Sequence, residues 1–261
     1  MLEFWVGSKL DAISNRRQPH RSDARATKRV MRRSKKMVFV TQHLRVLRTT
    51  LDHRLRWPGA KAPAEWCREN TLEKTPAAIE RLSREHSREE LRALCMNPQI
   101  SPDIAYLCVM AWGGQRPVNA REAWRARDKI AEQISKLRGS HPSPEDAYSL
   151  FTGSGSIPRL GVAYFTKILF FCSGSTDHYI LDQWTAKSMN LLCGHKLIPV
   201  LQNHVPRHTT PEQYARYCEL TDQLALELGV SGARAEELMF SQGGKTNRGA
   251  WRRYVMEHSG P

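Results

Sequence analysis

The chain has 261 residues, of which 40% are apolar and 25% charged. This composition is typical of a folded domain with a hydrophobic core and excludes wholesale disorder. No apolar run approaches the ~20 residues that a membrane helix needs, and the apolar stretch at residues 2–6 is too short for a secretory signal. The net charge is +14, and residues 1–60 hold 15 basic and 4 acidic residues. This block favours a polyanionic partner, nucleic acid before an anionic membrane surface.

Residues 1–36 are predicted to form a basic arm, with a helical body over residues 37–261. Few large apolar residues separate the basic side chains of the arm, so we expect it to be loose without DNA. An Arg-rich, acid-poor N-terminus also resembles an organelle transit peptide, although Asp11 and Asp23 argue against that interpretation. A translation start at Met31 or Met37 is a further alternative.

From residue 37 onward, capping signals predict helices rather than strands. Apolar side chains at helical spacing follow each signal, and period-2 alternation is rare. The expected start signals are Ser87-x-x-Glu90, Ser101-Pro102, Asn119-x-x-Glu122, Ser143-Pro144, Thr210-Pro211 and Ser231. The helix from Asn119 should continue through Leu137, and the helices from Ser143 and Thr210 should end at Gly153 and Gly229. The fold class is therefore all-α.

Residues 156–194 hold the most informative pattern. Residues 157–161 read Ile-Pro-Arg-Leu-Gly, and an apolar helix, a short polar loop at residues 173–178 and a second helix that ends at Gly194 follow. Between loop and second helix, residues 180–182 read Ile-Leu-Asp.

This pattern resembles the helix-hairpin-helix DNA glycosylases. Ile157, Pro158, Leu160 and Gly161 match the hairpin of that superfamily, and Asp182 matches its aspartate at a similar separation. Residues 110–114 and 163–167 resemble the bacterial branch that is named after 8-oxoguanine glycosylase (OGG-like). The resemblance covers about residues 90–240 and implies a helix-hairpin-helix glycosylase fold. It also implies that double-stranded DNA with modified bases is the partner.

The hairpin and the aspartate fit this chemistry physically. Gly161 allows the backbone to approach a phosphate, and the helix after it presents free N–H groups. Glycosidic cleavage builds positive charge on the sugar, which an Asp182 carboxylate would stabilise while it orients or deprotonates water. The alternative is that Asp182 is only an N-cap, a position that aspartate favours.

Two residues differ from the motif of the helix-hairpin-helix glycosylases. Members that also cut the strand carry a lysine two residues beyond the second glycine, where this chain has Ala163. We therefore expect a monofunctional glycosylase that leaves an abasic site, with Lys167, one turn later, as the less favoured nucleophile. Arg159 replaces the first hairpin glycine, which conflicts with a tight turn but would suit a phosphate.

Further site residues are predicted from their type and place in the chain. Trp112, Gln115, Trp184 and Asn119 are candidates for the pocket of a flipped base. A core role is the alternative for both tryptophans, and an N-cap role is the alternative for Asn119. Tyr164 and Phe165 are expected in the core. The predicted phosphate contacts are Arg116, Arg159, Gly161, Ala163 and Lys187.

The substrate is the least determined feature. The resemblance suggests either an oxidised purine or a hypermodified phage cytosine such as glucosylated 5-hydroxymethylcytosine, because some members act against phage. Ala163 favours the second, since oxidised-purine members usually carry the lysine. The six cysteines form no C-x-x-C pair. We expect buried thiols, no metal, no cofactor and a cytoplasmic monomer.

Two other classes of function are alternatives to a glycosylase. A non-catalytic DNA-binding protein can use a hairpin as a phosphate clamp. A tyrosine recombinase is suggested weakly by His204-x-x-Arg207 with Tyr214, Tyr217 and Tyr254.

Overall fold

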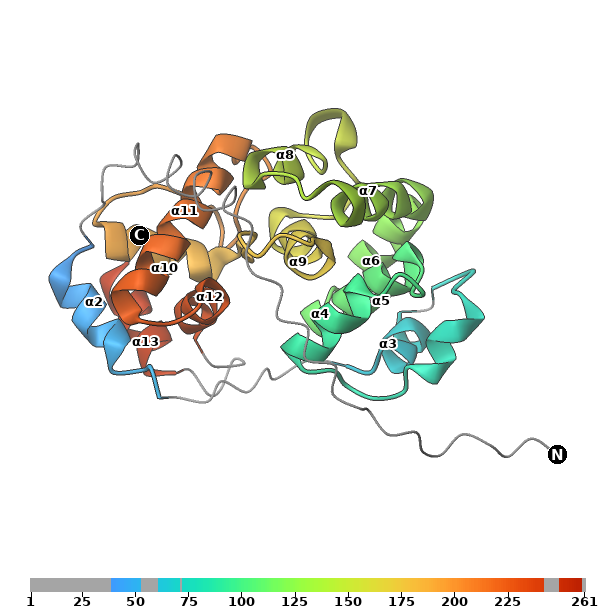
Figure 1. Ribbon diagram of the computed structural model, residues 1–261, viewed down its shortest axis with the longest axis horizontal. Coiled ribbons are helices and arrows are strands. Elements are labelled where there is room, and N and C mark those ends of the chain that lie inside the picture. The colour runs from blue at the N-terminus through green and yellow to red at the C-terminus, as the bar shows by residue number, and fades with distance from the viewer. Residues whose placement is uncertain (1–38, 53–60, 71, 242–248, 260–261) are drawn as a thin grey trace, which may run out of the picture. The chain divides into compact units, whose positions relative to one another are not determined.

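The computed structural model describes residues 39–52, 61–70, 72–241 and 249–259, which belong to a compact unit of residues 37–261. Within these ranges every regular element is helical, which confirms the all-α prediction (Figure 1). The predicted arm, residues 1–36, lies outside the described residues. The α-helices are α2 (Thr41–Arg48), α3 (Pro63–Glu69), α4 (Arg88–Met96), α5 (Pro102–Gly113), α6 (Pro117–Trp124), α7 (Arg127–Ser140), α8 (Pro144–Ser149), α9 (Val162–Cys172), α10 (Gln183–Cys193), α11 (Pro211–Leu228), α12 (Gly232–Phe240) and α13 (Ala250–His258). Two 3-10 helices, η1 (Ala77–Arg81) and η2 (Gly153–Gly155), connect them.

Five of the six predicted start signals are confirmed as helix N-caps. The side chains of Ser87, Ser101, Ser143, Thr210 and Ser231 each accept a hydrogen bond from a backbone amide in the first turn. Gly194 and Gly229 end α10 and α11 in the left-handed conformation that glycine adopts without strain. Local capping signals therefore fix where several of the helices begin and where α10 and α11 end.

The expected capping box at Asn119 is wrong. Pro117 occupies the first turn of α6 instead, with Arg116 as the N-cap, so Asn119 lies inside the helix. A proline has no N–H to leave unsatisfied and fixes φ near its helical value, which makes it the stronger start signal. The long helix expected through Leu137 is two helices, because the chain leaves helical geometry at Ala126. Likewise α8 ends at Ser149, and Gly153 opens η2.

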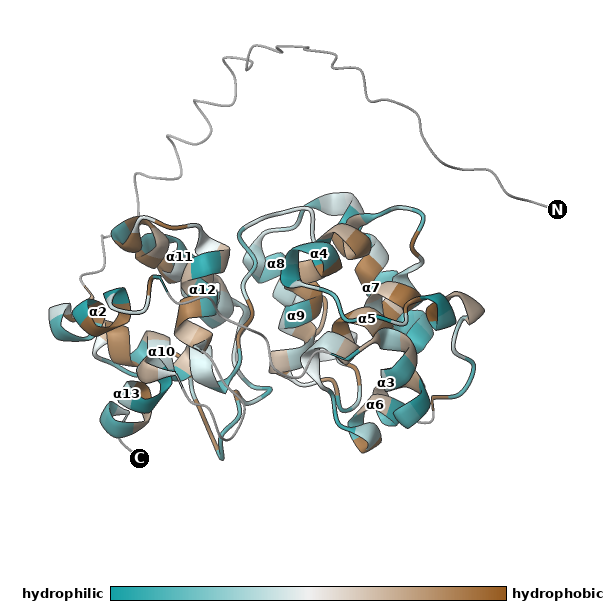
Figure 2. Ribbon diagram, turned by 90° about the horizontal axis from the view of Figure 1, so that it is seen from below, coloured by the Kyte–Doolittle hydropathy of each residue, from teal (hydrophilic) through white to brown (hydrophobic). Residues whose placement is uncertain are grey.

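Two helices form the centre of the unit. In α5 every residue from Ile104 to Trp112 is buried, and in α9 Val162 and all residues from Phe165 to Cys172 are buried. A helix that is apolar all round has to be covered on every side, and α3, α4, α7 and α9 pack against α5. Figure 2 shows that helices such as α2 and α13, by contrast, contain both hydrophilic and hydrophobic residues.

The remaining helices pack around α10. Helices α2, α12 and α13 contact α10, so the first described helix joins the last two, and α11 contacts both α8 and α12 (Figure 1). No helix in the described ranges is long and apolar enough to cross a membrane. All six cysteines are buried, as expected. This packing brings the starts of α9 and α10 to one surface.

Candidate active site

A cleft of about 980 Å³ opens where the hairpin and the starts of α9 and α10 converge with the α5–α6 corner and residues 203–207. Its lining includes eight of the predicted site residues: Arg116, Asn119, Arg159, Gly161, Ala163, Lys167, Asp182 and Trp184. Residues that the sequence separates by up to 68 positions therefore share one cavity.

The hairpin is anchored by its apolar residues and clamped from outside. Ile157 and Leu160 are buried, whereas Arg159 between them is exposed. Arg159 has a φ of 59°, so it adopts the left-handed conformation that the missing glycine would favour. The guanidinium of Arg207 donates to the carbonyl oxygens of Ile157 (2.5 Å) and Leu160 (3.0 Å). The tight turn thus forms in spite of the substitution, with added support from Arg207.

Gly161 is not required by the backbone of the turn; its lack of a side chain leaves the surface at the start of α9 open. Its φ is −75°, which any residue can adopt, and it is the N-cap of α9 without a side-chain cap. A Cβ at this position would meet no atom within 4 Å, so the glycine leaves open space. The amides of Val162 and Ala163, at the start of α9, have no hydrogen-bond acceptor among the described residues. This is the geometry of an anion site at a helix N-terminus.

Asp182 caps α10 and also lines the cleft. One carboxylate oxygen, Oδ1, caps α10 by accepting from the amides of Trp184 (2.7 Å) and Thr185 (3.0 Å). The other oxygen, Oδ2, has no hydrogen bond within the described part of the chain, and the side chain lines the cleft. The cap fixes the carboxylate and leaves one oxygen for chemistry.

The extended segment that leads into Asp182 is held by side chains, because no strand among the described residues pairs with its backbone. The hydroxyl of Thr166 on α9 accepts from the amide of Leu181 (3.0 Å). From α11, Tyr214 donates to the carbonyl of Tyr179 (3.0 Å) and Tyr217 donates to that of Ile180 (2.8 Å). Three side chains from two helices, α9 and α11, therefore hold the segment that positions the carboxylate.

Lys167 extends from α9 into the wall of the cleft. The residue is only 5% exposed, and its Nζ donates to the carbonyl of Ala163 at 2.8 Å. Burial lowers the pKa of this amine, and the charge of Asp182 opposes the shift. A Cβ on Gly113 would lie 2.9 Å from the lysine Cδ, so this glycine makes room for the side chain. The result is a buried amine beside the carboxylate.

Two predicted base-pocket residues lie in the core instead. Trp112 is 3% exposed and packs edge-on against Phe171, with ring centroids 4.9 Å apart. Gln115 is 2% exposed, and its Oε1 lies 3.4 Å from the hydroxyl of Tyr106. Both occupy the buried corner of α5, because the chain turns at Gly114 and directs Arg116 and Asn119 toward the cleft instead.

Other residues supply the aromatic and polar lining. Trp184 is half-buried in the cleft with the guanidinium of Arg252 4.4 Å from its ring centre. Tyr164, expected in the core, and Phe240, which the sequence analysis missed, also line the cleft. Gln183 lines it too, and its Oε1 is buried without a hydrogen-bond partner among the described residues. Gln183 could have been predicted from the sequence because it directly follows Asp182, whereas no sequence feature pointed to Phe240.

Lys187 lies outside this cleft. It is one turn beyond Trp184 on α10, and its Nζ donates to the Oδ1 of Asn203 at 3.1 Å. It lines a neighbouring cavity instead.

The recombinase alternative does not fit two of its three tyrosines. Tyr214 and Tyr217 are fully buried, and both hydroxyls are committed to the backbone before Asp182. Burial raises the pKa of both phenols. Arg207 is likewise committed to the hairpin. No cluster of three or more candidate metal ligands occurs among the residues that the structure describes.

Comparison with protein-family models matches residues 48–240 to the family described as putative 8-oxoguanine DNA glycosylase OGG-like protein. The matched range is about three quarters of the chain and contains the hairpin, Asp182 and all residues that line the cleft. No curated protein and no solved structure matches the chain.

Proposed function

Because the chain belongs to the OGG-like family of putative 8-oxoguanine DNA glycosylases, we propose that it hydrolyses the N-glycosidic bond of a modified base in double-stranded DNA. The product would be an abasic site. The observation that carries the proposal is the carboxylate of Asp182, which two backbone amides fix at the cleft while its Oδ2 has no hydrogen bond among the described residues.

The hairpin would hold the DNA backbone. The amides of Val162 and Ala163 and the space above Gly161 suit a phosphate, and the exposed guanidinium of Arg159 lies beside them. Arg116 adds a second exposed cation at the α5–α6 corner. These contacts position the duplex and read no sequence.

The flipped nucleotide would enter the cleft. Tyr164, Trp184 and Phe240 provide aromatic surface for a base, and Gln183 offers a buried acceptor for an edge of that base. As the glycosidic bond breaks, positive charge develops on the sugar, and the Asp182 carboxylate stabilises that charge. The same carboxylate orients or deprotonates the water that attacks the anomeric carbon.

The position of Lys167 supports a monofunctional enzyme. Its amine is directed back along α9 to the carbonyl of Ala163. A nucleophilic amine would have to give up that hydrogen bond and reach the sugar from a buried position. We therefore assign hydrolysis rather than strand cleavage to this site, with Lys167 as the residue that a lyase activity would use.

A bulky modified cytosine is the favoured substrate. The cleft volume of about 980 Å³ lies at the upper end of the ~300–1,000 Å³ that ligand pockets span, which suits a base that carries a sugar. Ala163 in place of the lyase lysine points the same way. A role in defence against phages with glucosylated 5-hydroxymethylcytosine follows, and we expect the protein to act as a cytoplasmic monomer. Excision of 8-oxoguanine is the alternative substrate.

The Asp182→Asn variant tests the proposal. Asparagine keeps an oxygen for the α10 cap but removes the charge, so we expect unchanged DNA binding and a single-turnover excision rate lower by about 10²–10³-fold. Bases released from a panel of DNAs, which includes modified phage genomes and 8-oxoguanine duplexes, are identified by mass spectrometry. A wild-type protein that binds DNA but releases no base, or an Asn variant that excises normally, would contradict the assignment.

Borohydride reduction separates the two roles of the lysine. A monofunctional enzyme forms no Schiff base, so the wild-type protein should give no covalent DNA adduct during excision. A trapped adduct that disappears in Lys167→Met would make Lys167 a nucleophile and the enzyme bifunctional.

A further inference from the structure

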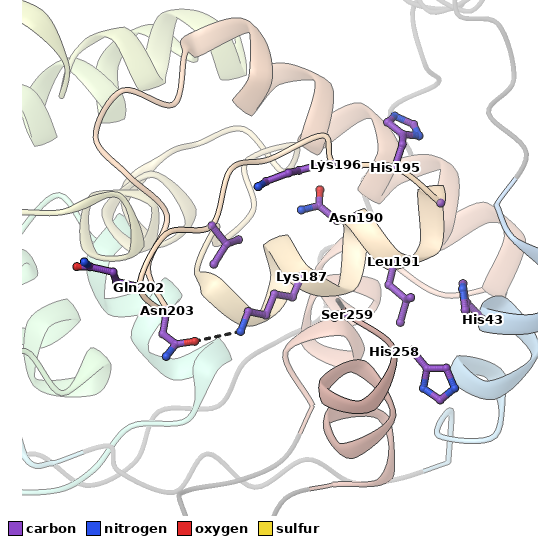
Figure 3. Close-up of a pocket in the computed structure, with 12 residues that line it drawn as sticks. His43, Lys187, Asn190, Leu191, His195, Lys196, Gln202, Asn203, His258 and Ser259 are labelled. Carbon is purple, nitrogen blue, oxygen red and sulfur yellow. Dashed lines mark hydrogen bonds between the residues drawn. The ribbon is translucent and has the colours of Figure 1, made fainter. Parts of the chain in front are cut away.

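A second cavity, of about 720 Å³, runs along α10 next to the cleft (Figure 3). We call it the α10 groove. One side is formed by the chain after α10, which includes His195, Lys196 and Asn203, and the other by His43 of α2 and His258 of α13. Nothing in the proposed base excision uses this groove.

The floor of the groove is a single stripe of α10. Lys187, Asn190, Leu191 and Gly194 are three, four and seven positions apart, which places them on one face of the helix. Asp182 caps the same helix at its other end. Twelve residues of helix separate Asp182 from Gly194, or ~18 Å, which corresponds to about five nucleotides of one strand along the axis of a duplex.

The wall after α10 is firmly built. The side chain of Asn190 accepts from the amides of Leu197 and Ile198 at 2.9 Å and donates to the carbonyl of Ile198 at 2.7 Å. These bonds hold the segment that carries His195 and Lys196 against α10.

A strained turn joins the groove to the cleft. Gln202 and Asn203 both adopt positive φ angles, 45° and 61°, between the paired residues Leu201 and His204. Non-glycine residues rarely take this conformation, and such strain is typical of functional surfaces. Asn203 lines both cavities and accepts from Lys187, a bond that is drawn in Figure 3.

All titratable side chains that line the groove are bases: His43, Lys187, His195, Lys196 and His258. The rings of His43 and His258 lie 6.2 Å apart. Burial and the neighbouring His258 lower the pKa of His43. No carboxylate from the described residues lines the groove, so an anion would meet donors and no fixed negative side chain.

The first described residues lie beside the same helix. The amide of Val40, just before α2, donates to the carbonyl of Leu192 on α10 at 2.8 Å. Eleven Lys and Arg residues precede Val40 in the sequence, within residues 1–36.

We propose that the α10 groove binds the phosphates of the DNA strand that flanks the flipped nucleotide. DNA is inferred as the ligand because this proposal rests on the proposed glycosylase function. The groove continues along the same helix that the candidate catalytic carboxylate caps. It extends the contact with DNA from the hairpin to the far end of α10. The source of the phosphates is the duplex, not a free nucleotide.

Lys196 provides the test, because it is exposed and lies outside the cleft. Affinity for a duplex with a central abasic-site analogue is measured against salt for wild type, Lys196→Gln and Lys196→Glu. Loss of one phosphate contact lowers the slope of log K against log salt by about 1, and the Glu variant should bind more weakly than the Gln variant. Lys136→Gln and Lys136→Glu on α7, another exposed lysine remote from the groove residues in sequence, are the matched controls and should leave the slope unchanged.

Uncharged methylphosphonates, each of which replaces one phosphate of the DNA, show which phosphate Lys196 contacts. Methylphosphonates placed one at a time along each strand should weaken wild-type binding at positions up to about five nucleotides from the analogue, and Lys196→Gln should be insensitive at one of them. The proposal would be overturned by unchanged salt slopes in both Lys196 variants, or by the absence of any methylphosphonate position whose effect depends on Lys196. It would also be overturned if a free nucleoside monophosphate competed for the protein as well as the duplex does. Base release is measured separately. If the wild type excises bases but the Lys196 variants bind DNA with an unchanged salt slope, only the groove proposal fails. If DNA binding depends on Lys196 but no base is released, only the glycosylase assignment fails.

Discussion

Arg159 occupies a tight turn of the hairpin and also presents a cation at the proposed phosphate site. Its position in the hairpin requires a left-handed backbone, for which glycine is the unstrained choice. The chain has an arginine there instead, exposed at the edge of the cleft. A residue that is kept at a strained position is expected to contribute something that glycine cannot, and a guanidinium beside a phosphate site is such a contribution.

Two substitutions separate strain from charge at this position. Arg159→Gly and Arg159→Ala both remove the guanidinium, so both should weaken DNA binding equally and lower the salt slope by about 1. Only glycine relieves the positive φ, so its free energy of unfolding should exceed that of the alanine variant by about 1 kcal/mol. Denaturant unfolding of the two proteins measures the difference, and equal stabilities would exclude the left-handed backbone.

Lys167 links the site to the pH dependence of stability. Its pKa in the folded protein lies below the ordinary 10.5, because burial penalises the charged amine. Below that lowered pKa the folded state carries the full desolvation cost, and the cost disappears as pH rises toward 10.5. The wild type should therefore gain stability relative to Lys167→Met over this alkaline window. At neutral pH the Met variant should be the more stable one, because it has no buried charge to desolvate. Free energies of unfolding measured across the window would contradict this if the two curves stayed parallel.

At the scale of elements, the site depends on how the chain passes from α9 to α10. Sequence patterns predicted both helices, the loop between them and the cap at Asp182, because caps and apolar periodicity are local signals. They could not predict that Thr166, Tyr214 and Tyr217 bind the backbone before Asp182, since these contacts join residues 15 to 37 positions apart. For the same reason the pattern left Trp112 open between core and pocket, misplaced Gln115 and missed Phe240. Whether a side chain lies in the core or in a cleft depends on which helices pack beside it.

Thr166 is the element-scale test of this arrangement. Thr166→Val keeps the shape but leaves the buried amide of Leu181 without its acceptor, which should cost about 1–3 kcal/mol of stability. The looser segment should slow single-turnover excision while DNA affinity stays near wild type, because the hairpin and the groove are untouched. Thr166→Ser retains the hydroxyl and should excise at close to the wild-type rate. A Val variant with normal excision would show that the position of Asp182 does not depend on this contact.

At the scale of the whole chain, charge is distributed unevenly. Residues 37–261 hold the hairpin, the cleft and the α10 groove, whereas residues 16–36 carry ten Lys and Arg residues against one acid. The candidate catalytic site and most of the net positive charge thus belong to different segments. Long-range attraction to phosphates adds affinity without shaping the reacting centre, so the two segments should contribute to different kinetic constants.

Removal of residues 1–36 tests this division. We expect DNA affinity at low salt to fall by at least about tenfold and the salt slope to decrease, because several phosphate contacts are lost together. The single-turnover excision rate at saturating enzyme should change much less, since Asp182 and the cleft are intact. Removal of residues 1–15 is the matched control, because that piece has one lysine and two acids and its loss leaves the positive stretch in place. Excision that falls more than affinity in the longer deletion would mean that the arm takes part in forming the catalytic site, and the separation of binding from chemistry would not hold.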